Sequence, residues 1–128
     1  MGVAAMYNFR RYLALSLFLL FLGLGAARAD GSENSTQPVL PKNLSHVKFA
    51  GADGSSCQKA IVITKAANNR EGVAAEKAWI AWKYPGAKIK GQAVSGAKNK
   101  TFDTLEIEAA SGEAKTLCFD ITDFFGQW

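Results

Sequence analysis

The fold is decided by two neighbouring stretches, AIVIT at residues 60–64 and REGVAAEKAWIAWKY at residues 70–84. The first is short, apolar and β-branched, which is typical of a strand buried on both faces. The second predicts a helix, because Asn68 or Asn69 can cap its start and the Pro85-Gly86 pair ends it. Together the two stretches predict a strand that is followed closely by a helix.

The predicted helix carries two apolar faces. A broad face combines small alanines with two indoles, which suits close packing on a sheet. A narrower stripe beside it contains Val73, Ile80 and Tyr84. The helix is therefore covered on more than one side, or one stripe is open to a partner. The broad face consists of Ala74, Ala75, Ala78, Trp79, Ala81 and Trp82.

After the helix the apolar period changes to two, which indicates strands. The connections between these strands, residues 95–100 and 110–113, each contain a glycine and are short enough for hairpins. We predict one small α+β domain over residues 46–128, in the order β-α-β-β-β. It has a three-stranded antiparallel meander and one helix packed on the sheet. The alternating stretches are residues 88–94, which alternate weakly, 101–109 and 115–122.

The two cysteines, Cys57 and Cys118, are expected to form a disulfide, because two cysteines in a small exported domain generally pair. The bond would close a long loop and stabilise the folded state by about 4 kcal/mol in the chain-entropy account. It would also place the first strand beside the last one. A redox-active pair is disfavoured, because the two residues lack the Cys-X-X-Cys spacing.

Residues 1–29 have the form of a secretory signal peptide. Arg10 and Arg11 precede an apolar run over residues 13–24, and small residues predict cleavage between Ala29 and Asp30. The run is shorter than the roughly 20 residues that a membrane-spanning helix needs, so we expect no stable span after cleavage. Residues 30–45 are polar and predict a flexible lead-in. The mature protein is therefore expected in the periplasm or outside the cell.

The basic character of the whole chain comes largely from the predicted leader. The chain has 15 basic and 11 acidic residues, and three of the basic residues but none of the acidic ones lie within residues 1–29. The remainder is close to neutral and gives no argument for binding to nucleic acid. Glycosylation sequons begin at Asn34, Asn43 and Asn99, and their use depends on the host.

Few residues could carry chemistry. The one histidine, His46, lies near the lead-in and has no second histidine or free cysteine to work with. With both cysteines paired we expect no metal site and no cofactor. The weak catalytic candidates are Asp103, Asp120 and Asp123, which could act as acid and base if two of them lay close together. Their structural interpretation is a solvent-facing or turn position, so the sequence favours a protein that is not an enzyme.

Aromatic side chains are the other candidates for function. Most of them are expected in the core, because a domain of this size needs large anchors. The aromatic C-terminal tail either docks on the helix or forms a contact patch. The candidate binding residues are Trp79, Trp82 and Tyr84 in the helix, and Phe124, Phe125 and Trp128 in the tail.

Four runs resemble small exported bacterial proteins of uncharacterised function: AIVI at residues 60–63, GVAAEKAW at 72–79, YPG at 84–86 and FDITDFFG at 119–126. The resemblance covers residues 57–126. It implies an envelope location and a single small α+β domain, and it implies no activity and no catalytic residue.

Our leading hypothesis is a small exported, non-catalytic binding protein that acts on another envelope or extracellular protein. An inhibitor or an accessory subunit is one concrete form of it. A first alternative is a carboxylate-dependent hydrolase that acts on envelope polysaccharide. A second alternative is a small-ligand-binding module whose cleft is lined by Trp79, Trp82 and Tyr84.

Overall fold

The structure, a computed structural model, describes residues 36–128. The predicted leader, its cleavage site and residues 30–35 of the predicted lead-in lie outside the described residues. Within residues 36–128 no helix is long and apolar enough to cross a membrane. The elements are β1 (Lys48–Gly51), β2 (Ile61–Thr64), α2 (Asn69–Lys83), β3 (Lys88–Ala97), β4 (Lys100–Glu108) and β5 (Ala114–Asp120), with short 3₁₀ turns η2 (Lys42–Leu44) and η3 (Cys57–Lys59).

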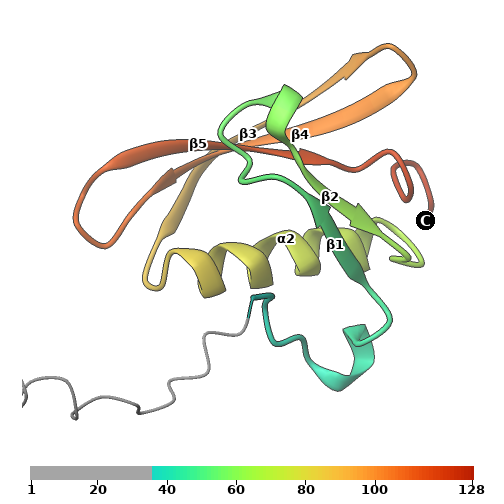
Figure 1. Ribbon diagram of the computed structural model, residues 1–128, viewed down its shortest axis with the longest axis horizontal. Helices are drawn as coiled ribbons and strands as arrows, with labels where there is room; N and C mark the ends of the chain where they lie inside the picture. The colour runs from blue at the N-terminus through green and yellow to red at the C-terminus, as the bar shows by residue number, and fades with distance from the viewer. Residues whose placement is uncertain (1–35) are drawn as a thin grey trace, which may run out of the picture. The chain divides into compact units, whose positions relative to one another are not determined.

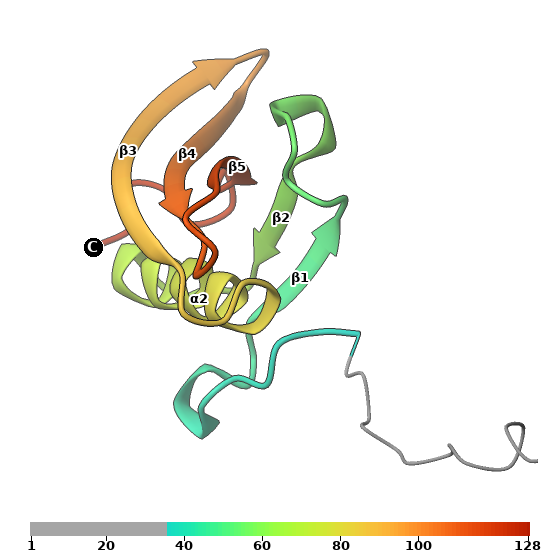
Figure 2. The same cartoon turned by 90° about the vertical axis from the view of Figure 1, so that its left-hand side faces the viewer.

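The strands form one mixed sheet in the order β1-β2-β5-β4-β3. The contact between β2 and β5 is parallel and all other neighbours are antiparallel. The predicted α+β class, the meander of β3, β4 and β5, and the position of β2 beside the last strand are confirmed. One strand, β1, is added to the predicted order at the edge next to β2. Figures 1 and 2 show α2 lying along one face of the sheet.

The helix begins where its cap predicts. Asn68 is the N-cap, and its side chain accepts a hydrogen bond from the Glu71 N–H at 3.0 Å. The buried face of α2 differs from the predicted broad face, because it is centred on Ala75, Trp79 and Ile80 and includes Glu76. Ala81 is exposed and Trp82 is half-buried. The buried face is therefore rotated about the helix axis relative to the predicted one, with Ile80 rather than Ala81 in the core.

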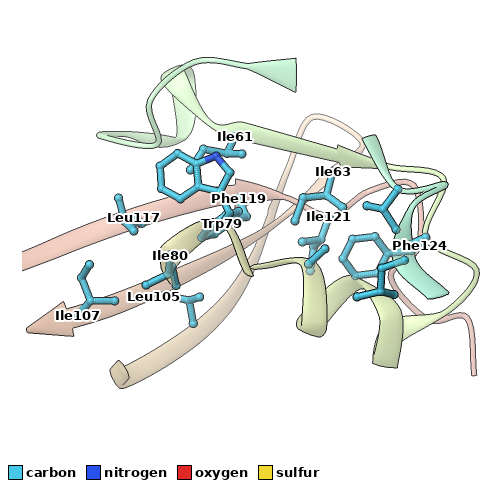
Figure 3. Close-up of a cluster of buried hydrophobic side chains, with 14 residues drawn as sticks. Ile61, Ile63, Trp79, Ile80, Leu105, Ile107, Leu117, Phe119, Ile121 and Phe124 are labelled. Carbon is cyan, nitrogen blue, oxygen red and sulfur yellow. The ribbon is translucent and has the colours of Figure 1, made fainter. Parts of the chain in front are cut away.

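The core lies between α2 and the helix-facing side of the sheet (Figure 3). Alternate residues of the central strands point into it, as the two-residue period of a strand requires. Trp79 stands edge-on against Phe119, with the ring centroids 5.7 Å apart. The buried strand residues are Ile61, Ile63, Leu105, Ile107, Leu117 and Phe119.

The predicted disulfide between Cys57 and Cys118 is present, with the Cα atoms 5.2 Å apart. It lies on the face of the sheet opposite the helix, because Cys118 alternates with the core residues Leu117 and Phe119. The Cys118 N–H also donates to the Gly54 carbonyl oxygen at 2.8 Å. The loop before β2 is therefore fastened to β5 by both a covalent bond and a hydrogen bond.

The hairpin between β3 and β4 is tighter than predicted. Lys98 and Asn99 both have positive φ, at 52° and 65°, and form a two-residue turn. Residues 95–97, expected in the loop, belong to β3. A bulge between Ile89 and Gly91 shifts the register, which explains why the alternation in this strand is weak.

Candidate functional site

The three predicted carboxylates do not form one cluster. Asp103 and Asp120 lie on neighbouring strands, but Asp103 pairs in register with Phe119 and Asp120 with Phe102, so their side chains point to opposite faces of the sheet. Asp120 accepts hydrogen bonds from the Thr122 hydroxyl at 2.6 Å and from the Thr122 N–H at 3.1 Å. Asp123 accepts from the Lys65 N–H at 2.7 Å. Asp120 and Asp123 are therefore each engaged in fixing the backbone near the C-terminus.

Asp103 instead meets a carboxyl group that the sequence did not single out. Glu76 points from α2 toward the sheet, and the two side chains are hydrogen-bonded. Both residues are buried, Glu76 with 2% and Asp103 with 1% of its surface exposed. Gln92 on β3 donates through Nε2 to Asp103 Oδ2 at 2.5 Å. The arrangement links α2, β4 and β3 through one small polar cluster.

The environment of this cluster favours the protonated form of Glu76. The pKa of Glu76 is raised to about 9, first because burial penalises the charged form and then because of the negative charge and the hydrogen bond of Asp103; Lys77 opposes the rise. Asp103 Oδ1 is buried and meets no N–H or hydroxyl donor of the described residues. A protonated Glu76 gives the pair the donor that two ionised carboxylates would lack.

In enzyme active sites, a carboxylic acid of raised pKa beside a second carboxylate commonly serves as a general acid. Here the near-complete burial of both side chains separates the pair from solvent. The arrangement can hold a proton and bind the helix to β4, and it offers no surface to a substrate. The sequence contains one indication that Glu76 faces inward. It lies next to Ala75 and three residues before Trp79, and the structure shows that both of these residues are buried.

The six aromatic residues predicted to bind a partner differ in how far they are buried. Trp79 and Phe124 lie in the core, with Phe124 against Gly72 of the helix. Trp82 and Tyr84 are half-buried at the margin of the core. Phe125 is half exposed, and the Trp128 side chain is 98% exposed. The tail therefore docks through Phe124, and Phe125 and Trp128 are the most exposed of the predicted binding aromatics.

Two open hollows flank the helix. One, of about 300 Å³, lies between β1 and the C-terminal half of α2, with Phe49, Trp79 and Trp82 in its lining. The other, of about 850 Å³, lies between the N-terminal half of α2 and the tail, where Val73, Lys77 and Trp128 line it. Two of the three residues predicted for a ligand cleft, Trp79 and Trp82, share the smaller hollow, and Tyr84 is not among its lining residues.

The most open surface of the described chain is the edge strand β3. It is 10 residues long, and all of its side chains are exposed apart from the position of Gly91. Ile89 and Val94 are 40% and 51% exposed. The other edge strand, β1, has 4 residues. The predicted meander, with the first strand beside the last one, implied that this strand lies at an edge of the sheet.

Metal ligands are not gathered in the part of the chain that the structure describes, where no group of three or more His, Cys, Asp or Glu could hold an ion. His46 lies on the surface and contacts Glu71 Oε2 at 2.6 Å through Nε2. The same Glu71 oxygen accepts from the Ala67 N–H at 2.8 Å. This N–H and then His46 lower the pKa of Glu71. The histidine is thereby tied to the start of the helix.

Comparisons with models of protein families, with curated proteins and with solved structures find no match to this chain.

Proposed function

We propose that the mature protein is a small exported, non-catalytic binding protein that acts on another protein in the periplasm or outside the cell. The observation that carries the proposal is the long edge strand β3, whose outer side is paired with no other strand of residues 36–128 and whose Ile89 and Val94 side chains are exposed. Extended segments of partner proteins commonly bind by adding a strand to such an edge. An inhibitor or accessory subunit would use the surface in this way.

Export is supported by two features of the chain. The leader-like residues 1–29 end at a small-residue cleavage pattern before Asp30. The disulfide between Cys57 and Cys118 is of a kind that persists in oxidising compartments outside the cytoplasm. Both features favour a protein that folds after translocation.

The positions and hydrogen bonds of the three candidate carboxylates favour a binding role over hydrolysis. Asp120 and Asp123 hold the backbone, and Asp103 is buried in the interior beside Glu76. A hydrolase acting on polysaccharide needs two carboxyls that flank a reachable bond. The exposed fractions of 1% and 2% for Asp103 and Glu76 leave no such approach.

The proposal is tested by affinity capture with residues 30–128 from an extract of the cells that produce the protein. Wild type is compared with Ala93→Pro and Val94→Pro, because successive N–H groups of an edge strand point alternately toward β4 and toward open solvent. The variant in which proline replaces a residue with an outward N–H should still fold, because that N–H makes no bond to β4. We expect this variant to lose binding to the partner. Val39→Pro, at an exposed residue before η2, is the control.

Hydrogen exchange on the wild-type complex gives the same test without a substitution. Amide exchange in β3 is expected to slow when the captured partner is bound. A partner that leaves β3 unprotected, and that a folded β3 proline variant still retains, would refute the edge-strand proposal.

A second candidate function is small-ligand binding in the hollow lined by Phe49, Trp79 and Trp82. Its volume of about 300 Å³ lies at the lower end of the usual range for ligand sites. A Trp128→Phe variant removes the exposed indole, so that the remaining indole emission reports on this hollow. Titration with a panel of mono- and disaccharides is expected to change that emission, and Trp82→Ala should abolish the response. A flat response over the panel would count against this candidate.

A further inference from the structure

The distribution of charged residues along β3 indicates which kind of partner segment can bind to its edge. Lys88 and Lys90 lie at the start of the strand and Lys98 lies in the turn at its end, whereas residues 91–97 carry no charge. The lysines of the described residues that form ion pairs with carboxylates are Lys90, Lys100 and Lys115. Lys88 and Lys98 form no ion pair with a carboxylate of the described residues. The residues of β3 therefore form an uncharged middle with lysines at both ends, and the carboxylates of Glu106 and Glu108 on β4 lie beside the first half of the strand.

The middle of this edge lacks the features that normally prevent strand addition. Natural edges are protected by proline, by short length, by bulges or by charges along the strand. Residues 91–97 contain no proline and no charge, and the one bulge of β3 lies before them, between Ile89 and Gly91. At the rise of an extended strand this stretch is about 20 Å long, enough for a partner strand of ordinary length.

The two faces of the edge differ. Val94 is paired with Asp103 and Gln92 with Leu105, so these side chains point to the helix side of the sheet. Ala93 and Ser95 point to the other side and are small. An added strand would contact apolar surface at Val94 on the helix side and would meet little steric bulk on the other side.

A second copy of this chain is disfavoured in the register that centres two β3 strands on Val94. Antiparallel pairing of two β3 strands about a symmetry axis at Val94 would place Lys90 of one copy opposite Lys98 of the other. Like charges that face each other across a strand pair are destabilising. The same lysines favour carboxylates at both ends of a strand from a different protein.

We infer that β3 binds, by antiparallel strand addition, an extended segment of another protein that has alternating apolar residues in its middle and acidic residues at both ends. This inference rests on the proposed function and adds the chemistry of the partner. The uncharged middle of β3 provides main-chain hydrogen bonds, Val94 provides apolar contact, and Lys88 with Lys98 provides the preference for acidic ends.

The test uses the synthetic peptide acetyl-Glu-Glu-Thr-Val-Thr-Val-Thr-Glu-Glu-amide and a matched peptide with lysine in place of each glutamate. Binding to ¹⁵N-labelled residues 30–128 is followed by NMR. We expect amide shifts centred on β3 with the acidic peptide, affinity that falls with added salt, and affinity about tenfold lower for the lysine peptide. The double variant Lys88→Ala, Lys98→Ala should remove most of this difference, whereas Lys42→Ala, Lys59→Ala should leave it.

The outcomes separate this inference from the proposed function. Equal affinity for the two peptides, or no binding of either while the captured partner still depends on β3, overturns the acidic-segment inference and leaves the proposed function standing. A concentration-dependent dimer with β3 protected from hydrogen exchange overturns the choice of partner. No peptide binding together with a captured partner that ignores β3 overturns both.

Discussion

Glu76 of α2 and Asp103 of β4 form a buried carboxyl pair that connects the helix to the sheet. Two ionised carboxylates in this position would repel each other and would have no donor between them. The raised pKa of Glu76, about 9, means that the pair holds a proton at neutral pH. The fold therefore contains an ionisable group whose protonated form is the stable one.

This pair predicts that the protein loses stability as the pH rises. The folded-state pKa of Glu76 is about 9 and its ordinary value is 4.5. Below the ordinary value both states hold the proton, and above it the unfolded chain ionises while the folded protein does not. The contribution of Glu76 to the free energy of unfolding should therefore fall by at most about 1.4 kcal/mol per pH unit between these two values. Glu76→Gln should remove this slope, because the amide keeps a donor toward Asp103 and does not titrate.

Urea unfolding of wild type and Glu76→Gln over this pH range measures the effect. Glu106→Gln, at an exposed position of β4, is the matched control and should keep the wild-type slope. If wild type and Glu76→Gln lose stability in parallel as the pH rises, the buried-proton interpretation is wrong.

Asp103→Asn should lower the pKa of Glu76 without returning it to its ordinary value. The substitution removes the second cause of the rise, the negative charge of Asp103, but it leaves the largest cause, which is burial. NMR titration of the Glu76 carboxyl carbon measures the shift. Asp123→Asn, on the exposed tail, should leave the Glu76 titration unchanged.

The main elements could be predicted from the sequence because their signals are local. The helix predicted at residues 70–84 is Asn69–Lys83, and the strand predicted at 60–64 is Ile61–Thr64. The cap at Asn68 and the stop after Lys83 are encoded within a few residues of the helix ends. The two cysteines were sufficient to predict that β2 lies near β5.

The candidate site was predicted only in part, because it depends on contacts between distant segments. Asp103, Asp120 and Asp123 were named as candidates that could act if two of them lay close together, and nothing local points to Glu76 as the neighbour of Asp103. The rotation of α2 decides that Glu76 faces β4, and hydrophobic periodicity assigns a glutamate to the solvent face by default. The edge position of β3 follows from the sheet order, which periodicity alone does not contain but which the predicted meander and disulfide together implied.

The disulfide is expected to be a major source of stability. Cys57 and Cys118 are 61 residues apart, and a loop of that length corresponds to about 4 kcal/mol in the chain-entropy account. For a domain of this size the loss should lower the melting temperature by about 20 °C. Thermal unfolding with and without reductant measures the effect. The double variant Cys57→Ala, Cys118→Ala should melt at the lower temperature and should not respond to reductant; a reductant response in that variant would contradict the assignment.

Gly72→Ala should destabilise the protein although alanine favours helices. A Cβ added at Gly72 would lie 2.0 Å from Phe124 Cε2, so the ring that fastens the C-terminal tail to α2 would have to move. Overpacking of this kind costs about 1–3 kcal/mol, against a gain in helix propensity of about 1 kcal/mol. The free energy of unfolding is measured for Gly72→Ala, Phe124→Leu and the double variant. The alanine should cost less in the Phe124→Leu background, because the smaller side chain leaves room. An alanine that stabilises the protein, or that costs the same in both backgrounds, would show that the tail does not pack on Gly72.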